Sequence, residues 1–259
     1  MMSRATIYLN KKLKMKTVAI MVSWWLDSYI MYYYAKKNWY KPIPIRVDLW
    51  QPYKEKELEA IRNFEFYDEI IQISISNFVD KIPTNVDKKN QIIPWRNLLL
   101  WVIWANFWEE VWIWALHSER HWKERDKSFK FFEDSTNLLT YIFNIVRERT
   151  ELKTPFFHLT KTGLVKRALE NWLTAEQLEK TSTCYDENTH NCWECSTCFK
   201  RRMAMVNNGI EEHFEKNPWE SDYCKEMIEE ITSWNKNGRL TSTRIEEIKS
   251  ALHTVWIEI

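Results

Sequence analysis

The chain has 259 residues, of which 45% are apolar and 28% charged, so it can bury a hydrophobic core. Its formal charge of +1 excludes the strong positive field with which many proteins attract nucleic acid or anionic membranes. Apolar runs fall short of the roughly 20 residues of a membrane-spanning helix, and the basic N-terminus lacks a signal-peptide core. We therefore expect a cytoplasmic protein without a membrane or nucleic-acid partner.

Two residue types occur in abnormal numbers. The chain has 3 glycines and 16 tryptophans, whereas glycine normally makes up about 7% of a protein. The two types together make up about that share. The positions of the tryptophans therefore have to be compared with the positions at which a fold requires glycine.

Buried strands alternate with helices through the first part of the chain. Strand-like apolar runs lie at 17–22, 42–49, 69–75 and 111–116, and helical patterns lie at 29–38, 53–65, 96–110 and 133–147. This alternation is typical of βαβ units that form a parallel sheet with right-handed crossovers. We predict an α/β fold, with a Rossmann-like parallel sheet and helices on both of its faces.

From residue 160 onward the pattern is helical, and a cysteine-rich knuckle interrupts it at 184–198. Further helices are predicted at 199–214, 219–234 and 241–253. We expect three parts in the chain: an N-terminal extension at 1–15, a nucleotide-binding α/β domain at 16–175, and a zinc-binding knuckle with C-terminal helices at 176–259.

The segment after the first strand reads Ser23-Trp24-Trp25-Leu26-Asp27-Ser28. In a doubly wound sheet this turn usually meets phosphate, which needs backbone N–H groups directed into one concavity beside a helix N-terminus. The two serines offer hydroxyl donors, and Asp27 is placed to orient the helix start or to hold Mg²⁺. Two indoles would fill the space of a phosphate, so the alternative is an aromatic turn that binds nothing.

With glycine at 24 and 25 the segment would read Ser-Gly-Gly-Leu-Asp-Ser, which resembles the pyrophosphate loop (PP-loop) of the N-type ATP pyrophosphatases. Other tryptophans also stand where glycine is expected. Trp39 and Trp172 each follow an asparagine at the predicted end of a helix, where a left-handed residue is common. The remaining members of this set are Trp50 at a strand end, Trp95 after Pro94, and Trp193 between two cysteines.

One group of tryptophans argues against a general substitution. Trp101, Trp104 and Trp108 are three and four residues apart on one predicted helix, which ordinary core packing explains. Most of the set nevertheless lies at glycine positions. We hypothesise that glycine codons were read as tryptophan, as happens when UGA encodes glycine but is translated under a tryptophan code.

Four of the five cysteines form the pattern Cys184-x₇-Cys192-x₂-Cys195-x₂-Cys198. Zn²⁺ prefers four such ligands in a tetrahedron, and a C-x₂-C loop presents two sulfurs at the right separation. An iron–sulfur cluster uses a similar run but has its fourth cysteine downstream, before a proline. Structural zinc is the prediction, and a cluster or free, redox-active thiols are the alternatives. Cys224 stands alone and is expected to be a free thiol.

The two motifs together resemble the 7-cyano-7-deazaguanine synthase family of queuosine biosynthesis, over about residues 16–214. At positions 24, 25, 50 and 193 the usual or frequent glycine of the family is tryptophan here. The markers of the resemblance are Ser23-x-x-Leu26-Asp27-Ser28, Leu49-x-Gln51, Pro94-x-Arg96-Asn97-Leu98, Thr160-Lys161, and Ser182-x-Cys184-Tyr185 leading into Cys192-x-x-Cys195-x-x-Cys198.

The resemblance implies an ATP-dependent ligase that converts 7-carboxy-7-deazaguanine to the nitrile with ammonia, through acyl-adenylate and amide intermediates. It implies ATP, Mg²⁺ and Zn²⁺ as cofactors and a homodimer as the assembly. The implied residues are Ser23, Asp27, Ser28 and Arg96 for catalysis; Ser23, Trp24, Trp25, Leu26, Asp27, Ser28 and Lys161 for ATP; Arg96, Asn97 and Asp126 for substrate; and Cys184, Cys192, Cys195 and Cys198 for zinc.

The segment 115–132 departs from the family. Only Asp126 and the aromatic residues after it match, and Ser128 stands where a cysteine would fall. The acid substrate is therefore open, and a PP-loop ligase that adenylates a different carboxylate is one alternative. Another is a non-catalytic, zinc-stabilised scaffold, if Trp24 and Trp25 are genuine. Thiolation of tRNA ranks low, because Cys224 is the only cysteine outside the knuckle.

Overall fold

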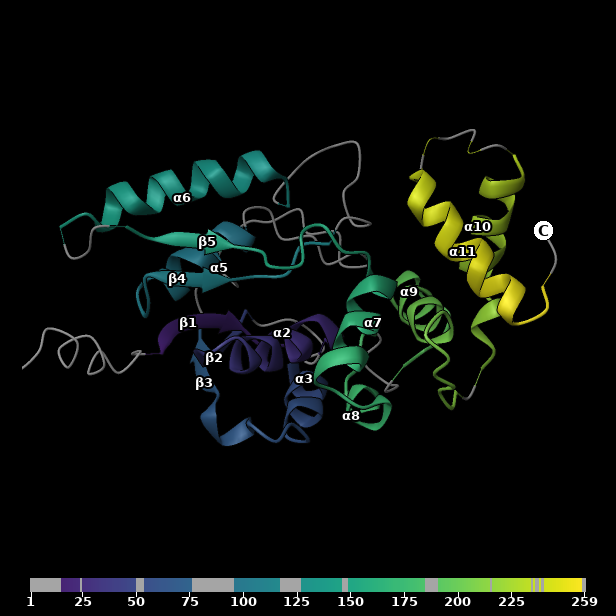
Figure 1. The fold of residues 1–259 in the computed structure, drawn as a ribbon, viewed down its shortest axis with the longest axis horizontal. Coiled ribbons are helices and arrows are strands. Elements are labelled where there is room, and N and C mark those ends of the chain that lie inside the picture. Colours follow the sequence, from purple (N-terminus) through teal and green to yellow (C-terminus); the bar gives the residue numbers. More distant parts are fainter. Residues whose placement is uncertain are drawn as a thin grey trace, which may run out of the picture.

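A parallel β-sheet forms the centre of the protein (Figure 1). The computed structural model describes residues 15–23, 25–49, 54–75, 96–116, 127–145, 149–184, 191–214, 216–233, 235, 238 and 240–257. Within these residues five strands pair in the order β3-β2-β1-β4-β5, and every neighbouring pair is parallel. The strands are β1 Lys16–Met21, β2 Tyr40–Asp48, β3 Ile71–Ser74, β4 Glu110–Trp112 and β5 Glu151–Lys153.

Helices connect these strands and continue beyond them. The predicted α/β class, with a parallel sheet and a helical C-terminal region, is confirmed. The helices are α2 Leu26–Lys37, α3 Lys54–Ile61, α5 Arg96–Ala105, α6 Phe129–Phe143, α7 Lys161–Asn171, α8 Ala175–Glu179, α9 Ser196–Val206, α10 Asp222–Thr232 and α11 Ser242–Thr254, with short 3-10 turns η1 Tyr67–Glu69 and η3 Pro218–Glu220.

The strand order explains why the helices lie on both faces. The chain steps outward from β1 through β2 to β3, then returns to the other side of β1 for β4 and β5. Because right-handed crossovers place the connecting helix on a face set by the direction of travel, reversal of direction moves the helices to the opposite face. Accordingly Val18 and Ile20 of β1 belong to the core with α2, α3 and α7, whereas Ala19 belongs to the core with α5 and α6.

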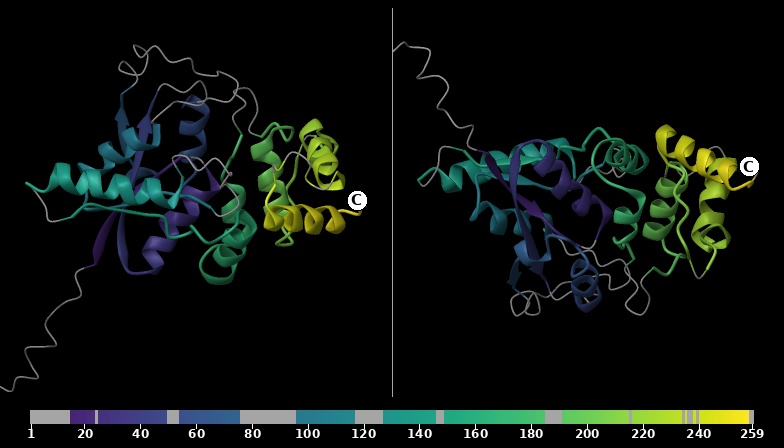
Figure 2. Two further views of the ribbon diagram at one scale, coloured as in Figure 1. Left: turned by 90° about the horizontal axis from the view of Figure 1, so that it is seen from above. Right: turned by 60° about the horizontal axis from the view of Figure 1, so that its bottom comes forward.

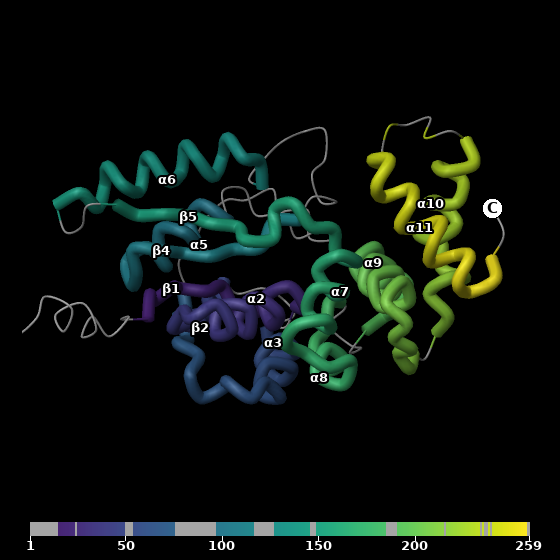
Figure 3. The backbone as a smooth tube through the Cα atoms, viewed as in Figure 1, coloured from purple at the N-terminus to yellow at the C-terminus, as the bar shows by residue number. Residues whose placement is uncertain are grey.

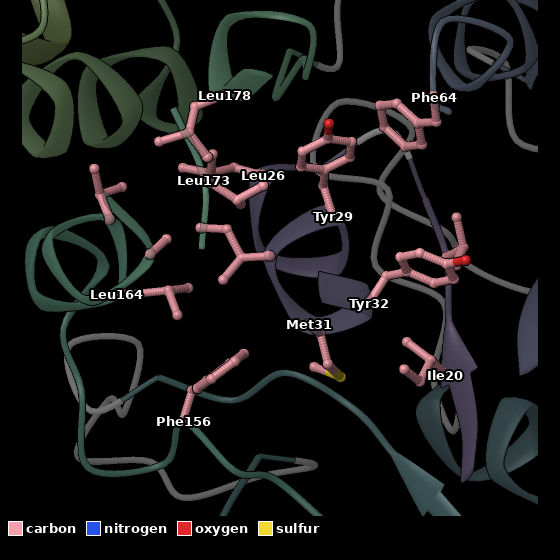
Figure 4. Close-up of a cluster of buried hydrophobic side chains, with 14 of the residues drawn as sticks. Ile20, Leu26, Tyr29, Met31, Tyr32, Phe64, Phe156, Leu164, Leu173 and Leu178 are labelled. Atoms are coloured by element: carbon pink, nitrogen blue, oxygen red, sulfur yellow. The ribbon is translucent and has the colours of Figure 1, made fainter. Parts of the chain in front are cut away.

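Helix α2 is the centre of the first core. Its side chains Leu26, Tyr29 and Met31 are fully buried, and Figure 4 shows them among residues from β1, α7 and the segment before α8. Tyr32 of the same helix stacks on Phe66 with ring centroids 3.7 Å apart. A helix buried over so much of its surface is typical of the first crossover of a doubly wound sheet.

The C-terminal helices form a separate apolar cluster. Phe199 and Met203 of α9 pack with Trp219, Ile248 and other residues of η3, α10 and α11. Figures 2 and 3 show α10 and α11 on the far side of α9 from the sheet. Ala204 and Met205 of the same α9 belong instead to the core around α2. Helix α9 therefore connects the two cores.

The two prolines of β2 lie where the sheet tolerates them. Pro42 pairs in register with Val18 of β1, and Pro44 with Ile20, whereas β3 pairs with β2 only from Ile45 onward. The prolines thus occupy the part of β2 that has no neighbour on its second side among the described strands, so the missing N–H groups cost no ladder bond there.

The sequence missed one strand and misplaced several helix ends. Strand β5 has only three residues, two of them charged, and so shows no apolar run. The helix predicted at 96–110 ends at Ala105, and the one predicted at 199–214 begins at Ser196 and ends at Val206. Within the described part of the chain, no helix combines the length and the apolarity that crossing a lipid bilayer requires.

Candidate nucleotide site and metal centre

The loops after β1 and β4 meet at the carboxyl edge of the sheet. These two strands are neighbours, with Ala19 opposite Val111, and the strand order reverses between them. Loops on either side of such a switch point form the ligand crevice of open α/β sheets. The rings of Trp25 and Trp114, one from each loop, stack with centroids 6.5 Å apart. The first predicted motif therefore lies at the position where this fold class binds ligands.

Two buried serine hydroxyls hold the loop after β1. Ser28 Oγ lies 2.6 Å from the carbonyl oxygen of Ser23 and 2.9 Å from that of Trp25, and it donates its hydrogen to these acceptors. It also accepts from the Ser23 backbone N–H at 3.2 Å. Ser23 Oγ in turn lies 3.4 Å from both Ser28 Oγ and the Trp25 N–H. The two predicted serines thus form one network that fixes the backbone beside the N-terminus of α2.

Asp27 and Lys161 complete this cluster with a buried ion pair. Lys161 is the first residue of α7, whose N-cap Thr160 accepts a hydrogen bond from the Gly163 N–H through its hydroxyl. The ammonium of Lys161 lies 3.0 Å from Asp27 Oδ2, and both side chains are almost completely buried. A cation is therefore held at the entrance of α2, where the helix dipole already favours an anionic ligand.

Trp25 fills the centre of the loop. It is the N-cap of α2, with φ −73° and ψ 142°, and its side chain makes no capping hydrogen bond. The Lys161 ammonium lies 5.7 Å from the centre of its ring. The backbone at this position is ordinary for any residue, so the case for glycine at 25 rests on the space that the indole takes. Trp24 lies outside the described residues.

The same loop is connected to the cysteine knuckle. Trp25 and Ser182 form an isolated parallel bridge. The hydroxyl of Ser182 lies 3.2 Å from Asn191 Oδ1, which precedes the second cysteine of the knuckle. Ser182 and Thr183 are fully buried and lead directly into Cys184. The segment with the first cysteine therefore lies beside the candidate nucleotide loop.

The four predicted cysteines converge. The sulfurs of Cys184, Cys192, Cys195 and Cys198 all lie within 4.8 Å of one another, although 14 positions separate the first from the last. A tetrahedral Zn²⁺ site with bonds of about 2.3 Å places its sulfurs roughly 3.8 Å apart. Among the described residues this is the single group of three or more cysteine, histidine or acidic side chains close enough to share a metal ion.

The chemistry of the sulfurs also fits a bound cation. Hydrogen bonding with Cys184 lowers the pKa of Cys192 to about 7 and lowers the pKa of Cys195 as well. The same kind of contact raises the pKa of Cys198, because it stabilises the neutral thiol there. Hydrogen bonding among the thiols thus favours ionisation of some members of the cluster over others, and a divalent cation would favour four thiolates. The residues present therefore fit the predicted zinc.

The comparisons with known proteins decide the family. The family model described as "Queuosine biosynthesis protein QueC" matches residues 17–209. The chain belongs to the QueC family.

Relatives of the QueC family match most of the chain at low identity. The 7-cyano-7-deazaguanine synthase of Nitratiruptor sp. is 27% identical over 233 residues, which cover 80% of this chain and 100% of that protein. The protein of the same name from Campylobacter hominis is 28% identical over 208 residues, covering 71% and 91%. That of Psychromonas ingrahamii is 24% identical over 219 residues, covering 76% and 96%. The resemblance inferred from the motifs is confirmed.

The remaining predicted site residues lie on α5 or outside the described residues. Asn97 is buried in the first turn of α5, which the structure places on the sheet face opposite α2. Arg96 begins that helix, but its side chain lies outside the described residues, as does the whole of Asp126. Their predicted roles in substrate binding stay predictions.

The structure adds two residues that the sequence did not single out as parts of the nucleotide site. Trp114 follows β4 and faces Trp25 across the switch point. Ser182 bridges the loop backbone from the knuckle side. Position 114 carried no signal for this role, because the sequence predicted a strand at 111–116 and the observed β4 ends at Trp112. Ser182 carried one, as a member of the family's cysteine marker.

Proposed function

We propose that this QueC family protein is an ATP-dependent carbon–nitrogen ligase that converts 7-carboxy-7-deazaguanine to 7-cyano-7-deazaguanine with ammonia. The observation that carries the proposal is the cluster of Ser23, Ser28, Asp27 and Lys161 at the switch point of the sheet. It combines a helix N-terminus, hydroxyl donors and a cation in the arrangement expected for a pyrophosphate group. The names of the relatives supply the substrate class.

The reaction needs activation because a carboxylate repels nucleophiles. Its oxygen attacks the α-phosphate of ATP, and pyrophosphate leaves, which gives an acyl-adenylate whose acyl carbon no longer belongs to a charged carboxylate. Ammonia then displaces AMP to form an amide. The amide oxygen then attacks a second ATP with loss of pyrophosphate and one proton, and departure of AMP with the second proton leaves the nitrile. Such catalysis depends mainly on positioning and on stabilising charge that develops on oxygen.

Different residues of the site are proposed for the phosphates, the metal ion and the acid substrate. Ser23, Ser28 and the backbone of 24–26 would bind the phosphates, and Lys161 would offset their negative charge. Asp27 positions Lys161 through the ion pair and is the member of this cluster whose carboxylate could bind Mg²⁺. Arg96, Asn97 and Asp126 are proposed for the acid substrate.

Zinc has a structural role in this proposal. Cys184, Cys192, Cys195 and Cys198 would hold it with four thiolates and leave no open position for a reactant. The backbone bridge between Ser182 and Trp25 would then connect the folded knuckle to the nucleotide loop. Bound zinc would therefore cross-link the segment 184–198.

The proposal is tested by turnover and by exchange. Protein of verified sequence is incubated with the carboxy-deazaguanine, ammonium and ATP, and the nitrile, AMP and pyrophosphate are followed by mass spectrometry. Formation of the nitrile with two AMP per product supports the proposal. ATP–pyrophosphate exchange driven by a different acid favours the alternative ligase, and failure to bind ATP favours the scaffold. Light scattering tests the proposed homodimer.

A further inference from the structure

Left-handed backbone in this protein falls on an unusual set of residues. Such backbone brings Cβ against the following carbonyl oxygen, so glycine adopts it readily, asparagine sometimes, and large residues rarely. Among the described residues the positive-φ positions are Gly209 (φ 70°), Gly238 (φ 61°), Asn235 (φ 55°), Trp39 (φ 62°), Trp193 (φ 59°) and Trp256 (φ 63°). Three of the four that are not glycine are tryptophan.

Two helix ends in the same chain allow a direct comparison. After α9, the Ile210 N–H bonds to the Met205 carbonyl at 3.0 Å and the Gly209 N–H bonds to the Val206 carbonyl at 3.0 Å. After α11, the Ile257 N–H bonds to the Leu252 carbonyl at 2.9 Å and the Trp256 N–H bonds to the His253 carbonyl at 3.2 Å. Both ends are Schellman motifs. Trp256 occupies in one the position that Gly209 occupies in the other.

Trp39 ends α2 in a similar way. It follows the C-cap Asn38, and its N–H bonds to the Lys36 carbonyl at 3.3 Å. Its side chain is 79% exposed, and that of Trp256 is 93% exposed. Burial of the indole therefore offsets little of the backbone strain at either position. A large side chain gains almost nothing there, whereas glycine would remove the strain.

Trp193 extends the pattern to the metal centre. It separates Cys192 from Cys195 with φ 59°, within the short loop that must present two sulfurs to one ion. Its ring lies 5.5 Å from that of Phe214. A left-handed residue between closely spaced ligands is again a glycine position.

The tryptophans outside the left-handed set differ in whether their buried indole N–H has a partner. A buried tryptophan normally donates its N–H to a partner. The Nε1 atoms of Trp104, Trp172 and Trp219 are buried without a hydrogen-bond partner among the described residues. By contrast, Trp112 donates to Glu110 Oε1 at 2.7 Å. The indole N–H of Trp112 thus has a hydrogen-bond acceptor, whereas those of the other three tryptophans have none among the described residues.

We propose that the protein made in its own cell carries glycine at positions 39, 193 and 256, where the printed chain has tryptophan, because these codons are read as glycine. The same reading at 24 and 25 rests on the proposed function, since only there does it open the loop for a phosphate. The protein of the source cell would therefore have relaxed helix ends, a relaxed knuckle and an open nucleotide loop.

Peptide mass spectrometry of the protein isolated from its source tests this directly. Peptides that span residues 39, 193 and 256 are expected to be lighter by the difference between tryptophan and glycine at each position. Tryptophan in these peptides would overturn the inference. The result does not depend on catalytic activity, so it stands apart from the test of the proposed function.

Matched variants of the printed chain test the physical argument. Trp39→Gly and Trp256→Gly are each expected to raise Tm by about 2–4 °C over the corresponding alanine variants, because both pairs remove the indole but only glycine relieves the backbone. Trp112→Gly is the control and is expected to lower Tm. Glycine variants no more stable than the alanine variants would contradict the assignment.

A comparison of the source protein with a double glycine variant distinguishes failure of this inference from failure of the proposed function. The Trp24→Gly/Trp25→Gly double variant is expected to bind ATP at least tenfold more tightly than the printed chain. If the source protein has glycine at 24 and 25 but the double variant binds no ATP, the proposed function fails and the glycine assignment stands. If the source protein has tryptophan at 24 and 25, the assignment fails there whatever the variant binds.

Discussion

The ammonium of Lys161 lies 3.0 Å from Asp27 Oδ2, although 134 residues separate the two in sequence. The pair joins the first turn of α7 to the first turn of α2 at the carboxyl edge of the sheet. Both charges are buried, so each depends on the other for compensation. The ion pair consequently has a structural role as well as its proposed role in phosphate binding.

Removal of one partner is expected to cost more than removal of both. Lys161→Met should lower the free energy of unfolding by about 3–5 kcal/mol, because it leaves a buried carboxylate without its cation. Adding Asp27→Asn should recover part of that loss. The measurement is urea unfolding of the single and double variants, with m-values compared.

The exposed pair Lys166–Glu170 provides the control for this cycle. Its atoms lie 3.9 Å apart on α7, and both side chains are mostly exposed. Lys166→Met should therefore change stability by less than about 0.5 kcal/mol. If Lys161→Met and Lys166→Met lowered the free energy of unfolding equally, burial of the pair with Asp27 would make no difference to stability.

The cysteine knuckle predicts that the purified protein contains zinc, and Cys224, which lies outside the knuckle, provides the control variant. The purified protein should contain roughly one Zn²⁺ per chain. Cys198→Ser should abolish binding and lower Tm by on the order of 10 °C. Cys224 is also buried but packs among α9, α10 and α11, so Cys224→Ser should retain the zinc. Elemental analysis and calorimetry make both measurements, and a zinc-free wild-type protein of unchanged Tm would refute the prediction.

The parts of this structure that the sequence revealed are those with local signals. Apolar runs marked β1 to β4, and the spacing of the cysteines marked a cluster that the structure brings within 4.8 Å. Strand β5 gave no such signal, because Glu151 and Lys153 flank its single leucine. The pairing of Asp27 with Lys161 gave no local signal either, since it depends on how α7 packs against α2, which lies 134 residues earlier in the chain at this contact.

The tryptophans show where local reasoning succeeded and where it did not. Trp39 was expected at a left-handed helix end and is found there with φ 62°. Trp172 was expected to behave in the same way, but its φ of −156° and ψ of −9° lie outside the left-handed region, so that part of the prediction is wrong. The end of α7 is closed by the Trp172 and Leu173 N–H groups, which both bond to the Ala168 carbonyl at 2.9 Å. That arrangement needs no left-handed residue.

The serine network predicts a change in nucleotide binding. Ser28→Ala removes the hydroxyl that bonds to the carbonyl oxygens of Ser23 and Trp25, and so loosens the loop. In protein that binds ATP, we expect the Kd for ATP to rise about tenfold, the size of effect produced by one buried hydrogen bond. Ser135→Ala is the control, because Ser135 is equally buried but lies in α6. An unchanged Kd in the Ser28 variant would remove that hydroxyl from the proposed site.

Glu65 predicts a pH dependence of stability away from the candidate site. Its carboxylate accepts hydrogen bonds from Lys180 Nζ at 2.7 Å, Tyr29 Oη at 2.8 Å and Tyr33 Oη at 2.9 Å. Burial by itself raises the pKa of Glu65, but the Lys180 contact, with those from its own backbone N–H and the two tyrosines, holds the pKa at about 2. The ionised carboxylate therefore connects α2 to the residue after α8.

Because the pKa of Glu65 is lower in the folded protein than the value of about 4.3 in an unfolded chain, its contribution is present above pH 4.3 and is lost as the pH falls toward 2. The side chain is partly exposed, so the contribution is about 1 kcal/mol or less. Glu65→Gln should be less stable than wild type at pH 7 by that amount, and the gap should close by pH 2–3. Urea unfolding at both pH values measures it, with Glu59→Gln on the exposed side of α3 as the control. A gap that persists unchanged at low pH would mean that the charge of Glu65 is not what stabilises this contact.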